Sequence, residues 1–596
     1  MNGDILLIQK FYEAQMIFGK YINKYYLKYA ALIVVGLVAL IAVDYAQLVI
    51  PEMYRTVIDG VNGEIPFDMN ILWSDICVPM FFIVVALVLG RFLWRICLFG
   101  SGIRVERDLR QKMFAHCEQL SCQFYSREKI GNLMSLFTND LETVQDCFGS
   151  GIMMTFDAAF LGGLALYKMF AMDWFLTLLS LIPMAFMVGI SLLVGKYMTM
   201  KWDVRQQAFS DLSDFAQESF SGIAVIKAFV KEFKELLAFR WLNKKNEDAN
   251  VAYTRISTLL NVFVTLFIES VICIVLGYGS YLVMNGAFTA GQLMEFIGYF
   301  NSIVWPMMAI TELIEMVSRG KASLKRVSDL LDAKQAVTDK EGAVTLDHVD
   351  GAIEFNHLTF RYPDSSYDAL QDVSFVINQG ENVGIIGKTG SGKTTVADLI
   401  LRCYNVEDNT LLIDGKDVND IQIKSLRDFC AYVPQDNFLF SDTIERNISF
   451  ASDTDDYERV VAASKLADID SNIQKFSHGY DTVLGERGIT VSGGQKQRIS
   501  IARALMKNAS ILILDDSVSA VDTDTEKTIL TNLKQTRQGK TTIVIAHRIS
   551  TVQGLDKIIL LDNGRVVDVG SHSELMDRCA DYQNMVALQA LEKEGK

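Results

Sequence analysis

The sequence predicts a chain of two parts: an all-helical polytopic membrane domain with six transmembrane helices, followed by an α/β domain with a largely parallel sheet. Half of the 596 residues are hydrophobic and the mean hydropathy is +0.22, which is high for a soluble chain. Apolar runs long enough to cross ~30 Å of hydrocarbon recur up to about residue 325. After residue 350, short β-branched segments such as ENVGIIG, ILILDD and TTIVIAH alternate with helical patterns.

Six apolar segments are expected to span the membrane. They lie near residues 29–51, 74–98, 149–171, 174–198, 260–284 and 290–312. Long charged, amphipathic stretches separate the second span from the third and the fourth from the fifth, so these helices are expected to extend beyond the bilayer. An even number of spans places both ends of the domain on one side. Because basic residues accumulate on the cytoplasmic side, both termini are expected there. The flanking basic residues are Lys20, Lys24, Lys28, Arg104, Arg107 and Arg110.

Composition excludes several other classes of protein. The net charge of −15 argues against nucleic-acid binding, which requires a basic face. The nine cysteines include no C-x-x-C pair, so we expect reduced, structural thiols. The N-terminal residues lack a basic region followed by an apolar core and a small-residue cleavage site. They are therefore not expected to be a secretory signal, and the chain is expected to start in the cytoplasm.

The expected domain boundaries follow these shifts in composition. Residues 1–28 are predicted to form a cytoplasmic N-terminal segment, and residues 29–325 the membrane domain with two long intracellular loops. The polar residues 326–350 are predicted to be a linker, and residues 351–590 the α/β domain.

A glycine-rich loop carries the clearest chemical signal. Residues 387–394 fit the phosphate-loop pattern G-x-x-x-x-G-K-[ST] between an apolar strand and an amphipathic helix. Glycines let backbone N–H groups surround phosphate oxygens, and the helix N-terminus adds partial positive charge. We expect Lys393 to reach the β- and γ-phosphates of ATP and Thr394 to ligate Mg²⁺. The predicted nucleotide-binding residues here are Gly387, Lys388, Thr389, Gly390, Ser391, Gly392, Lys393, Thr394 and Thr395.

The segment ILILD at 511–515 is predicted to be a buried strand that ends in a carboxylate. An aspartate at the carboxyl end of a parallel strand can meet the Mg²⁺ ion held by a phosphate loop. An apolar strand ending in aspartate is common by itself. Paired with the phosphate loop, Asp515 becomes a specific candidate metal ligand.

The segment VSGGQ at 491–495 precedes a helix with an apolar face and predicts a second anion site, made of a serine hydroxyl and glycine amides. With this segment the chain resembles the ATP-binding cassette family, whose signature reads L-S-G-G-Q. The resemblance implies an exporter-type membrane domain fused to a cassette. In that family the signature closes over the γ-phosphate bound by the opposite subunit. The implied ATP-binding residues are Ser492, Gly493, Gly494 and Gln495.

Other family elements follow in order. Tyr362 in FRYP matches the aromatic residue that stacks on adenine, and Gln435 in VPQD matches a glutamine that touches Mg²⁺ and the membrane domain. His547 in AHR matches the switch histidine. Residues 485–488 match the exporter-specific X-loop and residues 519–522 the D-loop. The resemblance thus implies catalytic roles for Asp516, His547 and Gln435, and Mg²⁺ ligation by Thr394, Gln435 and Asp515.

The resemblance extends from about residue 20 to residue 590. The segments that begin at Phe124 and Ser213 resemble the two intracellular loops of the exporters. They imply coupling helices near 124–131 and 211–219 that press into the cassettes, the second into the partner's. The alternative for both segments is a solvated amphipathic connector.

The sequence departs from the family pattern at Asp516, where a glutamate normally polarises the attacking water. A catalytic group misplaced by roughly 1 Å can cost about 10²-fold in rate. The surrounding residues 515–522 resemble the degenerate subunit of heterodimeric bacterial exporters. We therefore expect a slow site on this chain and a different partner chain, whose active site VSGGQ completes. The alternative is a homodimer that uses Asp516 at both sites.

The substrate is the least determined part of the prediction. The resemblance implies that ATP closes the cassettes and that a drug- or lipid-like amphiphile is exported; a peptide exporter and a regulatory ATP-binding subunit are the alternatives. Asp44, Asp157 and Glu269 lie within predicted spans, where charge is costly. They either attract cationic amphiphiles or form ion pairs with Arg91 and Arg95.

Overall fold

The computed structural model describes residues 19–452, 456–485, 488, 491–519 and 521–594. The chain divides into two compact units. The first contains Gly131–Asp332 and the preceding chain up to His116, and the second contains Cys117–Ile130 and the chain from Ala333 onward. Most of the predicted N-terminal segment, positions 486 and 487 of the predicted X-loop and position 520 of the predicted D-loop lie outside the described residues.

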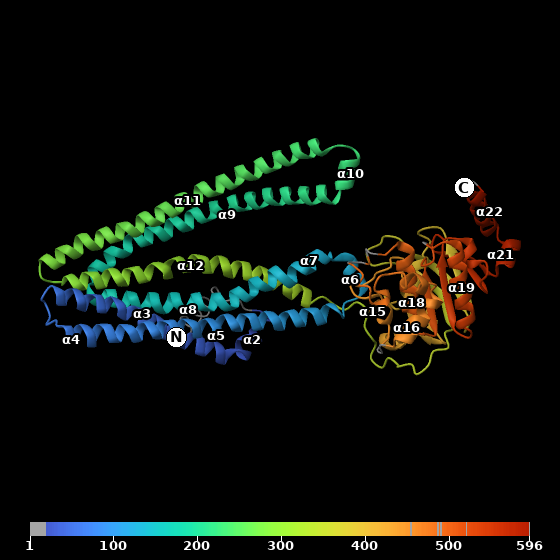
Figure 1. Ribbon diagram of the computed structural model, residues 1–596, viewed down its shortest axis with the longest axis horizontal. Coiled ribbons are helices and arrows are strands. Elements are labelled where there is room, and N and C mark those ends of the chain that lie inside the picture. The colour runs from blue at the N-terminus through green and yellow to red at the C-terminus, as the bar shows by residue number, and fades with distance from the viewer. Residues whose placement is uncertain (1–18, 453–455, 486–487, 489–490, 520, 595–596) are drawn as a thin grey trace. The chain divides into compact units, whose positions relative to one another are not determined.

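Long helices build the first unit (Figure 1). The described elements are α2 Asn23–Lys28, α3 Ala30–Val61, α4 Met69–Ile71, η1 Leu72–Cys77, α5 Val78–Cys117, α7 Ile130–Ser135, η2 Leu136–Asp140, α8 Leu141–Met172, α9 Trp174–Ser221, α10 Ile223–Ala228, α11 Glu232–Met284 and α12 Ala290–Leu331. The all-helical class predicted for this part is confirmed.

By length and composition, five described helical stretches are able to cross a membrane: Ala30–Val61, Met69–Cys117, Ile130–Met172, Glu232–Met284 and Ala290–Leu331. The predicted fourth span falls in α9, where the apolar stretch found among the described residues is Trp174–Met187. The count of six spans therefore stays a prediction.

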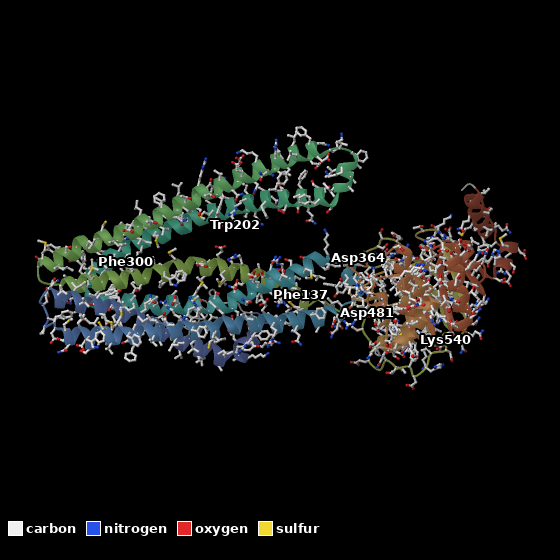
Figure 2. All side chains as sticks on the ribbon, viewed as in Figure 1. Phe137, Trp202, Phe300, Asp364, Asp481 and Lys540 are labelled. Atoms are coloured by element: carbon white, nitrogen blue, oxygen red, sulfur yellow. The ribbon has the colours of Figure 1, made fainter. Side chains whose placement is uncertain are left out.

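Helix α12 packs along α8 and α3, and α9 pairs with α11. Phe296 and Phe300 near the N-terminal end of α12 are at most 1% exposed and lie in a core with residues of α8, α9 and α11. Phe300 is labelled in Figure 2. Farther along the α9–α11 pair, Trp202 and Tyr253 meet edge to face, with ring centroids 5.4 Å apart. These contacts bury one apolar stripe of each helix.

A second apolar surface of this unit is exposed. On α5, Phe81 and Phe82 are 65% and 64% exposed, and their neighbours Val84, Val88 and Leu89 are exposed as well. A water-soluble protein rarely exposes so many adjacent apolar side chains. A lipid bilayer would cover them, in agreement with the hydropathy of this helix.

Two sheets organise the second unit. The strands are β1 Ile353–Phe360, β2 Leu370–Ile377, β3 Asn382–Gly387, β4 Leu411–Ile413, β5 Lys416–Asp417, β6 Cys430–Val433, β7 Ile511–Asp515, β8 Thr541–Ala546, β9 Lys557–Asp562 and β10 Arg565–Gly570. The larger sheet has the order β10-β9-β3-β8-β7-β6 and is parallel except at β10. This confirms the largely parallel sheet. The smaller sheet, β2-β1-β4-β5, is antiparallel and was not predicted.

Every side chain of β7 and β8 is buried, which shows that both faces of the larger sheet are covered at these strands. The carboxyl ends of β3, β7 and β8 lie side by side in this parallel arrangement, which is where such sheets place their ligands. The described helices of the unit are α6 Cys122–Arg127, α13 Lys393–Ile400, η3 Val418–Asp420, α14 Ile423–Asp428, α15 Ile444–Ser449, α16 Tyr457–Leu466, α17 Asp470–Ile473, η4 Gly479–Asp481, α18 Gly493–Met506, α19 Thr523–Thr536, α20 Ile549–Val552, α21 His572–Arg578 and α22 Ala580–Glu594.

Candidate nucleotide-binding site

The glycine-rich loop connects the end of β3 to the start of α13. Gly392 has a φ of +95°, and a Cβ atom there would lie 2.7 Å from the carbonyl oxygen of Ala369. A Cβ atom on Gly387 would lie 2.1 Å from the carbonyl oxygen of Leu561. Only glycine fits both positions without a shift of the backbone. The loop therefore has the tight curvature that directs backbone N–H groups toward an anion.

Two polar side chains of this loop are placed where they can bind phosphate oxygens. Lys393 is 6% exposed, and its Nζ donates hydrogen bonds to the carbonyl oxygens of Gly387 at 2.9 Å and Lys388 at 2.8 Å. Burial lowers the pKa of Lys393, and the nearby carboxylates of Asp515 and Asp516 partly oppose that shift. The hydroxyl oxygen of Ser391 is buried and bonds to no described group.

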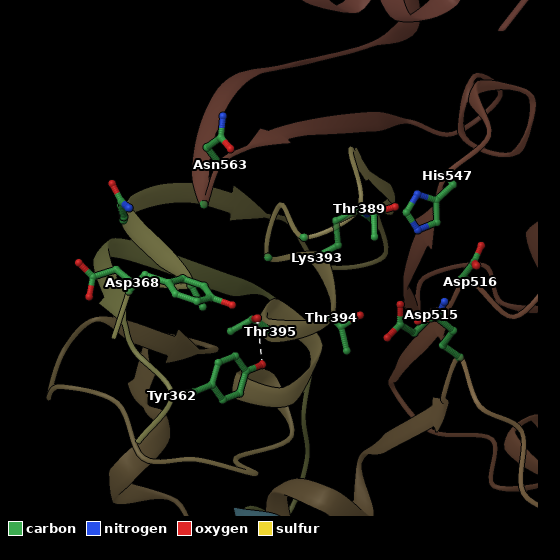
Figure 3. A pocket seen from close by; sticks show the side chains of 17 residues that line it. Tyr362, Asp368, Thr389, Lys393, Thr394, Thr395, Asp515, Asp516, His547 and Asn563 are labelled. Atoms are coloured by element: carbon green, nitrogen blue, oxygen red, sulfur yellow. Dashed lines mark hydrogen bonds between the residues drawn. The ribbon is translucent and has the colours of Figure 1, made fainter. Parts of the chain in front are cut away.

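A cavity of about 470 Å³ lies beside the loop (Figure 3). It brings together most of the predicted site residues, namely Tyr362, Thr389, Gly390, Gly392, Lys393, Thr394, Thr395, Gln435, Asp515, Asp516 and His547. Gly387, Lys388 and Ser391 lie in the loop but do not line the cavity. The sequence did not predict the other lining residues, which are Tyr367, Asp368, Ala369, Gln371, Asn563 and Gly564.

Oxygen atoms suited to Mg²⁺ gather at the end of β7. Asp515 is 1% exposed, and the Thr394 hydroxyl hydrogen-bonds to its carboxylate. The Tyr432 hydroxyl donates a second hydrogen bond to Oδ2 of Asp515 at 3.4 Å. Burial raises the pKa of Asp515, and these two hydrogen bonds partly counter that shift. Gln435 is exposed in the same cavity. A carboxylate, a hydroxyl and an amide oxygen are ligand types that Mg²⁺ accepts, so this donor set fits the ion.

Asp516 and His547 lie on the same side of the cavity as Asp515 (Figure 3). Asp516 has a φ of +45°, a left-handed conformation that aspartate tolerates better than most residues. Its N–H donates to the carbonyl oxygen of Ile545 at 2.9 Å, and its carbonyl oxygen accepts a hydrogen bond from Ser519 at 2.8 Å. Burial and the nearby charge of Lys393 lower the pKa of His547, so its imidazole is neutral at pH 7.

Two tyrosines line the cavity, and the sequence singled out one of them. The Tyr362 hydroxyl donates toward Thr395 at 3.0 Å and Asp398 at 3.3 Å, and its ring packs edge-on against Tyr404. Tyr367 is 72% exposed and has a ring face available to a planar base. The feature of the sequence that could have identified Tyr367 is its position in the same loop between β1 and β2 as Tyr362. We missed it because only Tyr362 matches a family motif.

The signature segment is ordered but lies away from the cavity. The Ser492 side chain accepts a hydrogen bond from the N–H of Gln495 at 3.3 Å, and the Gln495 side chain accepts one from the N–H of Ser492 at 3.0 Å. This capping box starts the helix α18. Ser492 and Gly493 are exposed, and no residue of 492–495 lines the cavity. One chain therefore does not bring its signature to its own phosphate loop.

The first predicted coupling segment, 124–131, overlaps α6, which belongs to the second unit. Nε of Arg127 in α6 donates to Oδ2 of Asp364 at 2.7 Å, and Asp364 lies in the loop that holds Tyr362 and Tyr367. Nε2 of Gln335 donates to Oε1 of Gln119, just before α6, at 2.7 Å. These contacts hold α6 within the second unit, and its coupling role stays a prediction.

A pair of thiols at this contact gives a testable prediction. Cys122 in α6 lines one small cavity with Cys403 and Arg427, and a hydrogen bond from Cys403, together with the charge of Arg427, lowers the pKa of Cys122 below its usual range. A thiolate beside a thiol oxidises readily. We expect diamide to join the two sulfurs, accepting the two electrons and two protons that the thiols release.

Mass spectrometry of non-reduced peptides should then find residues 122 and 403 linked. The linked peptide should be absent after Cys122→Ser and remain after Cys273→Ser, which removes an exposed cysteine of the first unit. If the wild-type protein gives no linked peptide after the diamide has reacted completely, the proposed contact between Cys122 and Cys403 is contradicted.

The second predicted coupling segment, 211–219, is not a separate helix but lies within α9, and the tip that follows it is apolar and exposed. Its side chains come from the end of α9, from α10 and from the start of α11. The exposed fractions are 74% for Phe220, 61% for Val225, 69% for Phe229, 79% for Val230 and 69% for Phe233. Such a cluster is typical of a surface that another protein covers.

Comparisons with known proteins cover nearly the whole chain. Residues 33–307 match the family model described as ABC transporter transmembrane region, and residues 370–519 match the one described as ABC transporter. The chain is 36% identical over 575 residues to the Probable multidrug resistance ABC transporter ATP-binding/permease protein YheI of Bacillus subtilis, covering 96% of this chain and 97% of that protein. It is 35% identical to the Multidrug resistance-like ATP-binding protein MdlA of Escherichia coli, over 94% of each chain.

A similar fold occurs among solved structures. A bacterial Atm1-family ABC exporter with ATP bound superposes with a TM-score of 0.76 at 26% sequence identity. The match covers 96% of this chain and 98% of the other. The order of helical unit and α/β unit is therefore shared along the whole length.

Proposed function

We propose, from the premise that this chain belongs to the ABC transporter family as a fused transmembrane and ATP-binding polypeptide, that it exports drug- or lipid-like amphiphiles across the cytoplasmic membrane. The chain is a multi-pass membrane protein and an ATPase coupled to transport of the multidrug type. The observation that carries the proposal is the cavity at the ends of β3, β7 and β8, joined in one chain to long apolar helices. In the proposed topology both termini lie in the cytoplasm.

The proposed chemistry assigns each side chain of the cavity a task. The loop around Lys393 binds the phosphates of ATP. Thr394, Gln435 and Asp515 would hold Mg²⁺, which would supply positive charge to neutralise the phosphates. Asp516 orients the attacking water and accepts its proton, while neutral His547 donates a hydrogen bond toward the γ-phosphate. The aromatic faces of the loop between β1 and β2 bind adenine.

The working unit in this proposal contains two chains. The signature residues 492–495 lie outside the cavity of their own chain, so a second cassette has to supply this anion site. The apolar tip from Phe220 to Phe233 provides an independent reason, because it needs a protein surface to cover it. ATP held between two cassettes stabilises only the closed pair, and so it shifts the membrane helices toward the outward-facing state.

We further propose that the partner is a different chain. Asp516 is one methylene shorter than the glutamate of the family pattern, so this chain supplies the slower site. Its signature completes the faster site on a partner that carries the glutamate. A homodimer with Asp516 at both sites is the second candidate, because an aspartate is still a carboxylate base.

One purification and one transport assay test these proposals. We expect an affinity-tagged copy, purified from its native host, to bring a second chain of similar size with it. In inverted membrane vesicles, the pair should accumulate a fluorescent amphiphile when ATP is added. A single chain that hydrolyses ATP rapidly by itself would reject the heterodimer. Vesicles that bind ATP but accumulate neither dyes nor labelled lipids would reject the amphiphile substrate and favour a peptide exporter.

A further inference from the structure

A second cavity, of about 310 Å³, lies inside the helical unit. Four helices contribute to its wall: α3, α5, α8 and α12. Three of these helices place polar groups in the cavity, where packing of apolar side chains alone would not require them. These groups belong to Asp44 on α3, Trp94 on α5 and Asp157 on α8. The nucleotide chemistry described above uses none of them.

Both carboxylates line this one cavity. Asp44 is 2% exposed and Asp157 is 8% exposed. Asp157 Oδ2 accepts a hydrogen bond from the indole N–H of Trp305 at 2.8 Å. Asp44 Oδ2 is buried, and no described group donates a hydrogen bond to it. Two adjacent buried carboxylates repel each other unless a proton or a cation joins them.

The two arginines that line the cavity do not supply that cation. Arg91 donates to the side chain of Gln47 at 3.3 Å. The guanidinium of Arg95 lies 5.4 Å from the ring centroid of Trp94. Among the residues that the structure describes, neither arginine forms an ion pair with Asp44 or Asp157. The expectation that these arginines neutralise the intramembrane acids is therefore unsupported by the geometry.

A second unsatisfied group complements the free carboxylate oxygen. Trp94 is 8% exposed, and its buried indole N–H finds no acceptor among the described residues. An unpaired acceptor and an unpaired donor in the same cavity are each costly to bury. A ligand with an N–H donor and a separate oxygen acceptor would satisfy both groups, and a positive charge on the donor would also offset the repulsion between the two carboxylates.

We propose that this cavity binds a protonated amine that also carries a hydroxyl, ether or carbonyl oxygen. The ammonium group lies between Asp44 and Asp157 and donates a hydrogen bond to Asp44 Oδ2. The oxygen accepts the indole N–H of Trp94, and the apolar part of the ligand contacts the ring of Trp305, which is 46% exposed. The inference rests on the proposed export function and names the substrate class that the cavity recognises.

Equilibrium dialysis of the full-length transporter in lipid nanodiscs, with its partner if one co-purifies, tests this proposal. The probe is radiolabelled propranolol, a secondary amine with a hydroxyl group and an aromatic ring system. We expect Asp44→Asn and Asp157→Asn each to weaken binding about tenfold or more, because each removes a charged acceptor. Trp94→Phe should weaken binding by about threefold, because it removes only a neutral donor. The matched control Asp203→Asn removes an exposed acid of α9 that lies outside the cavity.

A neutral analogue separates charge recognition from partition into lipid. N-acetylated propranolol keeps the ring and the hydroxyl but loses the cation, so it should not compete for the site. Equal binding of the probe to the Asp44→Asn and Asp203→Asn proteins would overturn the proposal, as would competition by the neutral analogue. Each variant is also tested for ATP binding, which a misfolded protein would lose. If the wild-type protein binds ATP and transports dye but does not bind propranolol, only the cavity assignment is rejected. If the wild-type protein transports no dye, the export function is rejected.

Discussion

Replacing Asp516 with glutamate is expected to raise the ATPase rate of this chain by up to about 10²-fold, because roughly 1 Å of misplacement of a catalytic group has that effect. Asp516 lines the cavity with Asp515 and Lys393, and hydrogen bonds to Ile545 and Ser519 hold its backbone in place. The added methylene therefore moves the carboxylate toward the phosphate loop rather than moving the chain. Phosphate release by the purified protein, measured at saturating ATP, gives the rate.

Two companion variants control this experiment. Asp524→Glu makes the same chemical change at an exposed position of α19 and should leave the rate unchanged. Asp516→Asn removes the base and should lower whatever activity the wild type has. Glutamate at a φ of +45° should cost ~1 kcal/mol of stability, visible as a lower thermal midpoint. An unchanged rate for Asp516→Glu, with ATP binding intact, would show that side-chain length at position 516 does not limit turnover.

Removing the phosphate-loop lysine by Lys393→Met is expected to weaken ATP binding by about 10²-fold, because a hydrogen bond to a charged group contributes ~1.5–3 kcal/mol. Lys393 is buried, and its ammonium now bonds to two loop carbonyl oxygens. A phosphate would replace those partners, and methionine can supply neither the charge nor the donors. Titration with a fluorescent ATP analogue measures the change directly.

The control for this variant is Lys465→Met, which removes an exposed lysine of α16 that lies outside the cavity. Its affinity for the analogue should match that of the wild type. Transport by the assembled complex then separates two roles of the chain. If Lys393→Met abolishes nucleotide binding on this chain while transport continues undiminished, the site is dispensable, and a regulatory subunit becomes the better description.

The parts of the fold that local sequence determines were predictable. The glycine pattern at 387–394 requires a tight loop, and β7 and β8 were predicted as buried strands because their residues are mostly apolar or β-branched. The long helices were visible as apolar runs, although hydropathy marked only the part inside the bilayer. In the structure α5 and α11 continue far past the apolar runs, because amphipathic helices extend wherever another helix buries one face.

The remainder depends on contacts between distant segments. Strands β4 and β5 have three and two residues, too short to show a period of two. The grouping of α6 with the second unit rests on pairs such as Arg127 with Asp364, which no local pattern announces. Tyr367 was missed because no motif marks it within the loop between β1 and β2. The unpaired groups of Asp44 and Trp94 appear only when four helices meet.

The apolar tip around α10 has a consequence for biogenesis. In the proposed topology and two-chain assembly, a newly made copy that has not yet met its partner would display Phe220, Phe229 and Val230 to the cytosol. Exposed clusters of this kind attract chaperones and proteases and promote aggregation. If the partner is the different chain proposed above, cells that make one chain in excess should degrade the surplus, and the abundance of each chain should follow the supply of the scarcer one.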